Sequence, residues 1–368
     1  MQAQHGYHYD LPIAPSRQRS MTLYLHIGTG KTGTTSIQTF LEENRDALRR
    51  AGTVVPKSPG RRNHRKLTMY ALNDDVIENS RRSKGLVTLD RIESFRKQFL
   101  EDFRTEARSW KGSENVVLTS EQMTRLRREG ELERLKALLD IAGRPIKVIV
   151  YLRRQDLYFI SEYSQLIKGG LTLPLSVEGA RVNLAIYDYR KLLSTWARTF
   201  GQASLIVRAF EPQQLKNSDV LDDFMSIIGF DDLAAFTRPG VRNQSLDAHT
   251  VEFLRSINPS VPRWIDGRPN PARAGLVEFL EEISSGPKLR LARQQAAKFL
   301  ETFQPSNAEV ARTYLGREDG VLFRRSPGDD GGVDPSLSAE QAVEISGKIW
   351  NHLMAAELAR RAGETHSG

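Results

Sequence analysis

The sequence contains no cysteine among its 368 residues. This absence excludes disulfide bonds, thiolate metal sites and a cysteine nucleophile. It is typical of a protein of the cytoplasm, where we expect this chain to act. The longest apolar run, residues 148–152, has the length of a strand rather than the roughly 20 residues that span a bilayer. Residues 1–20 lack the apolar core of a signal peptide, so we predict a disordered tail there.

The chain has fewer acidic than basic residues. It contains 45 Asp and Glu and 53 Lys and Arg, which give a formal charge of +8. This excess favours anionic partners such as nucleotides, acidic polysaccharides, nucleic acids or anionic lipids, without choosing among them. Nucleic acid is the least favoured of these, since the basic residues lack interleaved aromatic residues that stack on bases. Aromatic residues make up only 8% of the chain and are scattered along it, so no aromatic-lined pocket for a phenol is predicted.

Strand and helix patterns alternate along the first two thirds of the chain. Short β-rich runs predict strands at 22–27, 53–56, 115–119, 146–152 and 204–210. Helical spacing predicts helices at 34–52, 92–110, 131–141, 155–167 and 187–200. The basic stretch 58–84 is predicted to be irregular. This alternation indicates an α/β fold, a three-layer sandwich with a central parallel sheet.

We predict one α/β domain over residues 21–327, with helical additions after about residue 215, and a linker plus C-terminal helix over residues 328–368. The glycine-rich segment 328–332 is the predicted linker, and the last helix is expected at 338–361. That helix has an apolar face. The protein's own core and a partner are the two candidates to cover it, and we expect the core. The residues of this face are Ala342, Val343, Ile345, Ile349 and Leu353.

The segment that follows the first strand, residues 28–35, reads Gly-Thr-Gly-Lys-Thr-Gly-Thr-Thr and opens the first helix. Glycines let the backbone curl so that its N–H groups point inward, and the helix N-terminus adds partial positive charge. Lys31 supplies a mobile full charge. We therefore predict an anion site here, with Gly30, Lys31, Thr32, Gly33, Thr34 and Thr35 as the binding residues.

A nucleotide triphosphate loop is the obvious rival for this segment. Its pattern, Gly-x-x-x-x-Gly-Lys-Ser/Thr, aligned on Gly30-Lys31-Thr32, requires glycine at position 25, where this chain has leucine. A strand ending in an aspartate for magnesium is also not evident, because residues 115–119 lead into Ser120-Glu121 and residues 146–152 into Arg153-Arg154. The triphosphate interpretation is disfavoured.

Lys31-Thr32-Gly33-Thr34-Thr35 resembles the 5′-phosphosulfate loop of the sulfotransferase family, Lys-Ser/Thr-Gly-Thr-Thr. The preceding His26-Ile27-Gly28 is similar to the bacterial branch of that family. The resemblance covers roughly residues 21–325 and implies a P-loop-like topology. It also implies 3′-phosphoadenosine-5′-phosphosulfate (PAPS) as the sulfuryl donor and no metal ion.

Members of the family bind the 3′-phosphate of the donor with an arginine after a later strand and a serine eight positions further on. Arg153 and Ser161 match this spacing, with Arg154 as the alternative if the register differs by one. An arginine offers a bidentate fork for a dianionic phosphate, and the serine adds a hydroxyl. Arg242, followed by Asn243, is a looser match to a third basic element of the family.

Sulfuryl transfer needs a cation at the leaving oxygen, the role given to Lys31, and a base for the acceptor proton. The cytosolic branch of the family places a histidine just after the strand that precedes the arginine strand, and Glu121 occupies that position here. Glu121 is therefore the predicted base. His26 and His64 are its competitors. His26 is equally well explained as a packed strand-end residue, and His64 as an acceptor-binding residue or as part of a solvated basic loop.

The resemblance thus implies a PAPS-dependent sulfotransferase that acts on a hydroxyl of an acceptor. We expect a carbohydrate, because arginine-rich segments at 61–66, 81–84 and 125–128 suit a polyanionic chain. Two alternatives stay open: a nucleotide kinase that uses the same loop, and a non-catalytic polyanion-binding protein on the same scaffold. No cluster of His, Asp and Glu has metal-ligand spacing. The oligomeric state is not predicted by the sequence.

Overall fold

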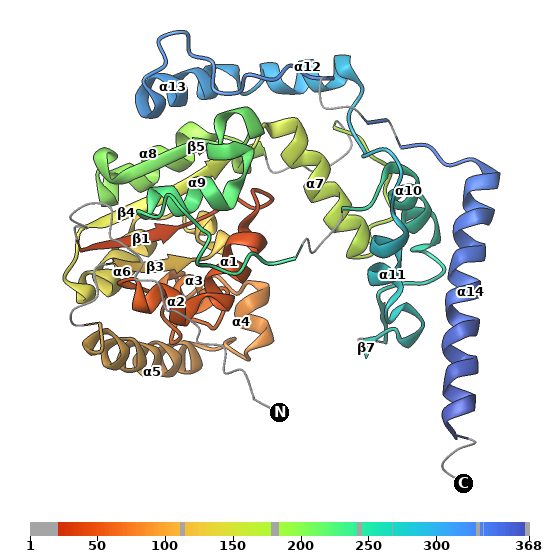
Figure 1. Cartoon of the computed structure of the whole chain (residues 1–368), viewed down its shortest axis with the longest axis horizontal. Coiled ribbons are helices and arrows are strands. Elements are labelled where there is room, and N and C mark those ends of the chain that lie inside the picture. The colour runs from red at the N-terminus through yellow and green to blue at the C-terminus, as the bar shows by residue number, and fades with distance from the viewer. Residues whose placement is uncertain are drawn as a thin grey trace, which may run out of the picture. The chain divides into compact units, whose positions relative to one another are not determined.

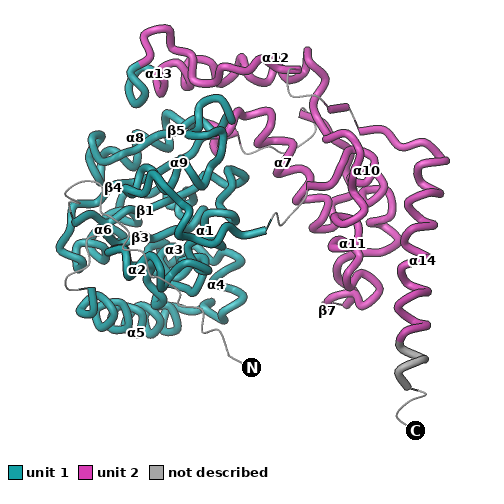
Figure 2. Tube along the Cα trace, viewed as in Figure 1, with its two compact units in different colours: residues 1–152, 189–240, 312–316 teal, residues 153–188, 241–311, 317–368 magenta. Residues whose placement is uncertain are grey.

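The computed structural model describes residues 21–110, 115–177, 184–240, 245–266, 268–328, 332–333 and 335–364 (Figure 1). The chain divides into two compact units (Figure 2). Unit 1 comprises residues 1–152, 189–240 and 312–316, and unit 2 comprises residues 153–188, 241–311 and 317–368. The predicted tail 1–20 lies outside the described residues. The predicted domain boundaries at 327 and 328 stay a prediction.

A five-stranded parallel sheet forms the centre of unit 1. Its strands are β1 (Thr22–His26), β2 (Thr53–Val54), β3 (Asn115–Thr119), β4 (Ile146–Leu152) and β5 (Leu205–Ala209). Their order is β2-β3-β1-β4-β5, so β1 lies in the middle and pairs in parallel with β3 and β4. Both faces of such a sheet are covered, which explains why β3 and most of β4 are apolar and buried.

Helices pack on both faces of the sheet. On one face, Val117, Ile149 and Tyr151 pack with α1 (Thr34–Glu43) and α9 (Val220–Ile227) in one buried apolar cluster. Strand residues alternate in direction, so Val148, Val150 and Leu152 point to the opposite face. There α8 (Tyr189–Phe200) contacts β4 and β5, and α6 (Glu129–Leu139) contacts α8. This arrangement confirms the predicted three-layer α/β fold (Figure 1).

The helices of unit 1 that remain are α2 (Arg45–Arg50), α3 (Arg65–Ala71), α4 (Asn79–Ser83) and α5 (Leu89–Arg108), together with the 3₁₀ turn η1 (Glu121–Arg125). The prediction that residues 58–84 are irregular is therefore wrong, because α3 and α4 lie within them. Both helices are too short to be stable alone in water and depend on tertiary contacts. The helix predicted at 92–110 is α5, and it begins earlier than predicted, at Leu89.

Unit 2 is helical apart from a small exposed hairpin, β6 (Trp264–Ile265) and β7 (Arg268–Pro269). Its helices are α7 (Gln155–Lys168), α10 (Ala248–Ile257), α11 (Leu276–Ile283), α12 (Arg293–Glu301), most of α13 (Gln304–Leu315) and α14 (Ala339–Glu364). Aromatic residues that are scattered in sequence converge here into one cluster of rings: Tyr158, Phe159, Tyr187, Phe299 and Phe303. These rings are buried against one another, so they form a core.

The C-terminal helix α14 docks on unit 2 through only part of its apolar surface. Ile345 is buried, and Ala342 and Ile349 are partly buried against the core of unit 2. Val343 and Leu353, predicted to belong to the same docked face, are exposed. The expectation that this helix docks on its own core is thus right for Ala342, Ile345 and Ile349, and wrong for the other two residues. In the described part of the chain, no helix is long and apolar enough to cross a membrane.

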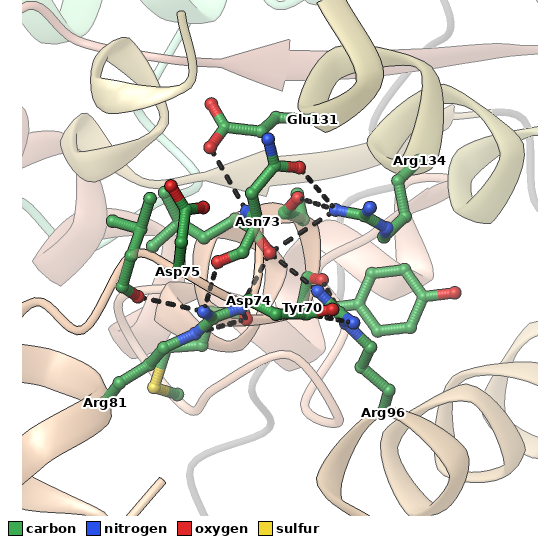
Figure 3. Close-up of polar contacts among 12 residues, drawn as sticks. Tyr70, Asn73, Asp74, Asp75, Arg81, Arg96, Glu131 and Arg134 are labelled. Carbon is green, nitrogen blue, oxygen red and sulfur yellow. Dashed lines mark hydrogen bonds and ion pairs between the residues drawn. The ribbon is translucent and has the colours of Figure 1, made fainter. Parts of the chain in front are cut away.

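Three arginine side chains hold the C-terminal end of α3 (Figure 3). Arg81 is fully buried. Its guanidinium donates five hydrogen bonds of 2.6–3.1 Å to the carbonyl oxygens of Met69, Leu72, Asn73 and Val76. Arg96 donates to the carbonyls of Tyr70 and Leu72, and Arg134 to that of Ala71. The last carbonyls of a helix have no partner within it, and these arginines satisfy them.

Two carboxylates complete the same cluster. The Glu131 carboxylate accepts the backbone N–H of Asn73 at 3.1 Å, and Asp74 pairs with Arg96 at 2.6 Å. In the turn after α3, arginine side chains thus bond backbone carbonyls, and a glutamate carboxylate bonds a backbone N–H group. Because α3 begins directly after His64, the cluster also fixes the helix that follows the loop carrying Asn63 and His64.

Replacing Arg81 by methionine should lower the free energy of unfolding of unit 1 by about 3 kcal/mol, because several buried carbonyls then lose their donors. Urea denaturation followed by circular dichroism measures the change. Arg82→Met is the matched control, since the neighbouring Arg82 is exposed, and it should change stability by no more than about 0.5 kcal/mol. Equal effects of the two substitutions would contradict a structural role for Arg81.

Candidate functional site

The connection between β1 and α1 turns through three residues with left-handed backbone conformations. These are Gly28 (φ 100°), Lys31 (φ 64°) and Gly33 (φ 74°). Glycine adopts such angles freely, whereas for lysine they cost on the order of 1 kcal/mol. Local backbone strain of this kind is concentrated at functional sites. The strained residue of this loop is the lysine predicted to bind the anion.

The first residues of the loop are hydrogen-bonded to the backbone of Tyr151 in β4. The N–H and the hydroxyl of Thr29 both donate to the carbonyl of Tyr151, at 2.8 and 3.1 Å, and the N–H of Tyr151 donates to the carbonyl of Gly28. The buried hydroxyl of Thr32 donates to the carbonyl of Thr29 at 2.7 Å. Thr32 thus stabilises the loop from inside, and a contact of its hydroxyl with a ligand stays a prediction.

Helix α1 begins at Thr34 without a side-chain cap. Its N-cap is Gly33, and its first turn contains no acidic residue. Thr34 is buried, whereas Thr35 is exposed. The first N–H groups of such a helix point toward whatever lies before it and carry its positive dipole end. The polarity of this helix start suits an anion, and anion binding by the loop stays a prediction.

Glu121 lies beside this loop, at the end of the strand next to β1. The N–H of Ser120 donates to the carbonyl of His26 at 3.0 Å. A Cβ atom placed on Gly28 would lie 3.1 Å from the Cα and Cβ atoms of Glu121. The absence of a side chain at Gly28 thus lets the start of η1 approach the loop closely. The predicted base and the predicted anion loop belong to one edge of the sheet, where parallel sheets carry their sites.

The carboxylate of Glu121 is held by two side-chain amides. Gln38 Nε2 donates to Oε2 at 2.8 Å, and Asn63 Nδ2 lies 3.1 Å from Oε1 and 2.9 Å from Oε2. Gln38 comes from α1 and Asn63 from the loop before α3. We call Gln38 and Asn63 the carboxamide clamp. Neither amide was predicted from the sequence. The one available signal was Gln38, a polar residue between Ile37 and Phe40 on the buried face of α1.

Both candidate histidines are fully buried. His26 Nδ1 lies 2.9 Å from the hydroxyl of Thr119, and its ring packs against Tyr151 and Phe224. Burial lowers the pKa of His26 to about 3. Of its two interpretations, the packed strand-end residue is the one that fits these contacts.

His64 bridges β3 and the segment before α3 with both ring nitrogens. The N–H of Thr119 donates to His64 Nδ1 at 2.9 Å, so Nε2 carries the proton and donates to the carbonyl of Pro56 at 3.0 Å. Burial lowers the pKa of His64 to about 3. These contacts are structural and exclude a solvated loop position for this ring. Acceptor binding by His64 stays a prediction, and its neighbour Asn63 is the residue that reaches Glu121.

The predicted second anion site falls in unit 2, at the start of α7. Arg154 is buried there, and its guanidinium forms a bidentate ion pair with Asp156 and donates to the carbonyls of Arg325 and Ser326. This pairing uses Arg154 for structure, so Arg153 is the arginine of the pair to consider for a phosphate. Arg153 and Ser161 are both half-buried. Arg242 lies outside the described residues.

Several cations of the predicted polyanion-binding segments have partners within unit 1. Arg81 is buried among carbonyl oxygens. Three other arginines form ion pairs of 2.7–2.8 Å: Arg61 with Glu42, Arg125 with Glu78, and Arg128 with Asp75. The expectation that all three segments grip a polyanion is therefore wrong for Arg81. Arg62 and Arg65 are exposed on either side of Asn63 and His64. Among the described residues, no group of three or more His, Asp or Glu is arranged to hold a metal ion.

No model of a known protein family matches the chain. It is 28% identical over 217 residues to an uncharacterized protein of Archaeoglobus fulgidus, and the match covers 56% of each chain. The chain thus spans about half the length of this curated relative. The similarity is too low and too partial to assign a family.

Two solved structures show weak likeness to the chain. One is a sulfotransferase from Alicyclobacillus acidocaldarius, with 14% identity, a TM-score of 0.36, and coverage of 66% of this chain and 93% of the other. The other belongs to the PezAT toxin–antitoxin system of Streptococcus pneumoniae, with 12% identity, a TM-score of 0.26, and coverage of 59% and 80%. Both TM-scores are low, and neither likeness decides the activity of this chain.

The two buried histidines should make the stability of unit 1 depend on pH. Each has a pKa of about 3 when folded and a usual value of 6.5, so between these values the unfolded chain binds more protons. Stability is therefore fully present above pH 6.5 and falls as the pH drops, by roughly 1 kcal/mol per pH unit for each histidine. Urea midpoints measured from pH 7 to 5 test this. His64→Asn should reduce the slope, and an unchanged slope would contradict the assignment.

Proposed function

We propose that this protein is a sulfotransferase that moves a sulfuryl group from PAPS to a hydroxyl group of an acceptor. The observation that carries the proposal is the edge of the sheet where the strained Lys31 loop, the uncapped start of α1 and the Glu121 carboxylate adjoin one another. An anion-binding loop directly beside a held carboxylate suits the transfer of an anionic group to a hydroxyl that must lose its proton.

The donor's 5′-phosphosulfate is the group that fits the loop of residues 30–35. Curled backbone and the start of α1 supply N–H donors, and Lys31 supplies the cation. In unit 2, Arg153 and Ser161 are our residues for the 3′-phosphate, because Arg154 is already bound to Asp156. Arg242 is retained as a further donor contact. The 3′-phosphate is what separates this donor from a nucleoside triphosphate.

The proposed reaction is an in-line displacement at sulfur. The acceptor oxygen forms a bond to sulfur while the bond from sulfur to the bridging phosphate oxygen breaks, and the 3′,5′-bisphosphate leaves. Lys31 stabilises the negative charge that develops on the bridging oxygen. Glu121 accepts the acceptor's proton, and the carboxamide clamp orients its carboxylate. Each step uses this chain's own side chains, so we expect activity without a metal ion.

A carbohydrate that carries negative charge is the acceptor class we propose. Arg62, on the loop before α3, and Arg65, the first residue of α3, are exposed near Asn63, which bonds the proposed base. In this proposal the acceptor approaches from their side. The large aromatic cluster of unit 2 is a packed core, which gives no support to a phenolic acceptor. A neutral sugar would leave these two arginines without a role.

Adenosine 3′,5′-bisphosphate, the spent donor, should bind with a micromolar dissociation constant in calorimetric titration. Arg153→Ala should weaken it by at least about tenfold, the loss of one charge-assisted contact. Arg82→Ala is the matched control, an exposed arginine that should leave affinity unchanged. Preference for ATP with magnesium would favour the kinase alternative. Indifference to Arg153 would remove it from the donor site.

Glu121→Gln should lower the turnover number at least about 100-fold while the affinity for the bisphosphate stays within threefold, because the amide cannot accept the acceptor's proton. The assay measures bisphosphate released from PAPS in the presence of hydroxyl acceptors that carry carboxylate or sulfate groups. Glu129→Gln, an exposed carboxylate on α6, is the control and should retain full activity. Activity within threefold of wild type in Glu121→Gln would exclude Glu121 as the base. Binding without any transfer in wild type would favour the polyanion-binding alternative.

A further inference from the structure

Asn63 and Glu121 are anchored at the same residue, Thr119, the last residue of β3. The N–H of His64 donates to the carbonyl of Thr119 at 2.9 Å, and the N–H of Thr119 donates to Nδ1 of His64 at 2.9 Å. His64 thus takes the place of a strand residue beside the end of β3, beyond the point where β2 has ended. Asn63 directly precedes His64, and Glu121 follows Thr119 by two residues. The two side chains therefore project from one short frame.

The loop before His64 closes tightly on the backbone of Asn63. Gly60 has a φ of 143°, and a Cβ atom placed there would collide with the carbonyl oxygen of Asn63. The same carbonyl accepts the N–H of Arg65 at 2.8 Å. On the other side of the loop, Nε2 of His64 donates to the carbonyl of Pro56 at 3.0 Å. The backbone that carries the Asn63 amide is thus fixed by close packing and by hydrogen bonds.

The Asn63 amide faces Glu121 at a cost to its own carbonyl oxygen. Among the described residues, Oδ1 of Asn63 is buried and has no hydrogen-bond partner. Such atoms are exceptions in folded proteins and call for an explanation, which strain or function supplies. Turning the amide over would place Oδ1 against a carboxylate, which has no proton to donate when ionised. The Glu121 carboxylate therefore determines how this amide lies.

The two oxygens of Glu121 are bonded unequally. Oε2 accepts Gln38 Nε2 at 2.8 Å and Asn63 Nδ2 at 2.9 Å, whereas Oε1 has only the longer contact of 3.1 Å with Asn63. An ionised carboxylate has about two acceptor positions on each oxygen. The hydrogen bonds of the described residues thus occupy both positions of Oε2 and leave one on Oε1. A proton that reaches this carboxylate meets an open position at Oε1.

We propose that Asn63 is a positioning residue for the transfer, which occupies Oε2 of Glu121 and leaves Oε1 to accept the proton of the acceptor hydroxyl. The O–H bond of the acceptor breaks, its oxygen forms the bond to sulfur, and the proton binds Oε1. This assignment rests on the proposed function and names the residue and the oxygen that its base step uses. Gln38 shares Oε2 but belongs to α1, whose start is part of the proposed donor site, so Asn63 allows a cleaner test.

The test compares Asn63→Ala with Asn63→Asp in the assay of bisphosphate release from PAPS. Asn63→Ala should lower kcat about tenfold, through the loss of a hydrogen bond to a charged group. Asn63→Asp should lower it at least about 50-fold, because two carboxylates this close repel and retain a proton between them. A purely structural role predicts the reverse order, since aspartate has the shape of asparagine. The acceptor KM and the bisphosphate dissociation constant should stay within about threefold.

The matched control is Asn79→Asp, which adds the same charge at an exposed asparagine of α4 and should retain full activity. In the Glu121→Gln background, Asn63→Ala should lower the residual turnover by less than about twofold, because no base remains to be positioned. Circular dichroism verifies that the variants are folded. Equal effects of Asn63→Ala in both backgrounds, or a milder effect of Asn63→Asp than of Asn63→Ala, would overturn the assignment and leave the sulfotransferase proposal intact.

A crystal structure with the bisphosphate and an acceptor tests the choice of oxygen. The reacting hydroxyl should contact Oε1 of Glu121, and contact with Oε2 would contradict the assignment. Wild type that transfers no sulfuryl group to any acceptor would overturn the proposed function, and the role of Asn63 with it.

Discussion

The connection from β1 to α1 is the constraint on which the site depends. The chain must leave the middle strand, turn through left-handed conformations at Gly28, Lys31 and Gly33, and enter a helix within a few residues. Backbone hydrogen bonds to Tyr151 hold this turn on one side, and the close approach of Glu121 to Gly28 holds it on the other. The strands that flank β1 therefore shape the loop as much as its own sequence does. A substitution in either flank is therefore expected to change the shape of the loop.

Net charge and surface charge are different quantities in this protein. The sequence has an excess of cations, but several arginines serve as internal hydrogen-bond donors. Arg81 is buried among carbonyl oxygens at the end of α3, and Arg154 is buried against Asp156 in unit 2. Buried arginine is stable in these positions because its planar fork satisfies several acceptors at once. The cations that remain for a ligand are a smaller set, and Arg62 and Arg65 beside Asn63 belong to it.

Sequence patterns predicted the sheet well because its strands are buried on both faces and read as continuous apolar runs, as in β3 and β4. The glycines after the first strand likewise predicted the turn that leads into α1. The short helices α3 and α4 were not predictable, since tertiary bonds to Arg81 stabilise them and their own sequence does not. The carboxamide clamp was missed for a related reason: Asn63 and Glu121 are 58 residues apart, and only the fold brings them together. Val343 and Leu353 of α14 were assigned to the docked face because the sequence cannot tell which side of a helix is covered.

The central claim is that one edge of the sheet holds the sulfated end of a PAPS-type donor beside a carboxylate base. A crystal structure of the protein with adenosine 3′,5′-bisphosphate tests it most directly. The account predicts the 5′-phosphate against Lys31 and the first N–H groups of α1, the 3′-phosphate on Arg153 and Ser161, and the Glu121 carboxylate facing the donor. A nucleotide bound elsewhere, or a 5′-phosphate without contact to Lys31, would contradict it.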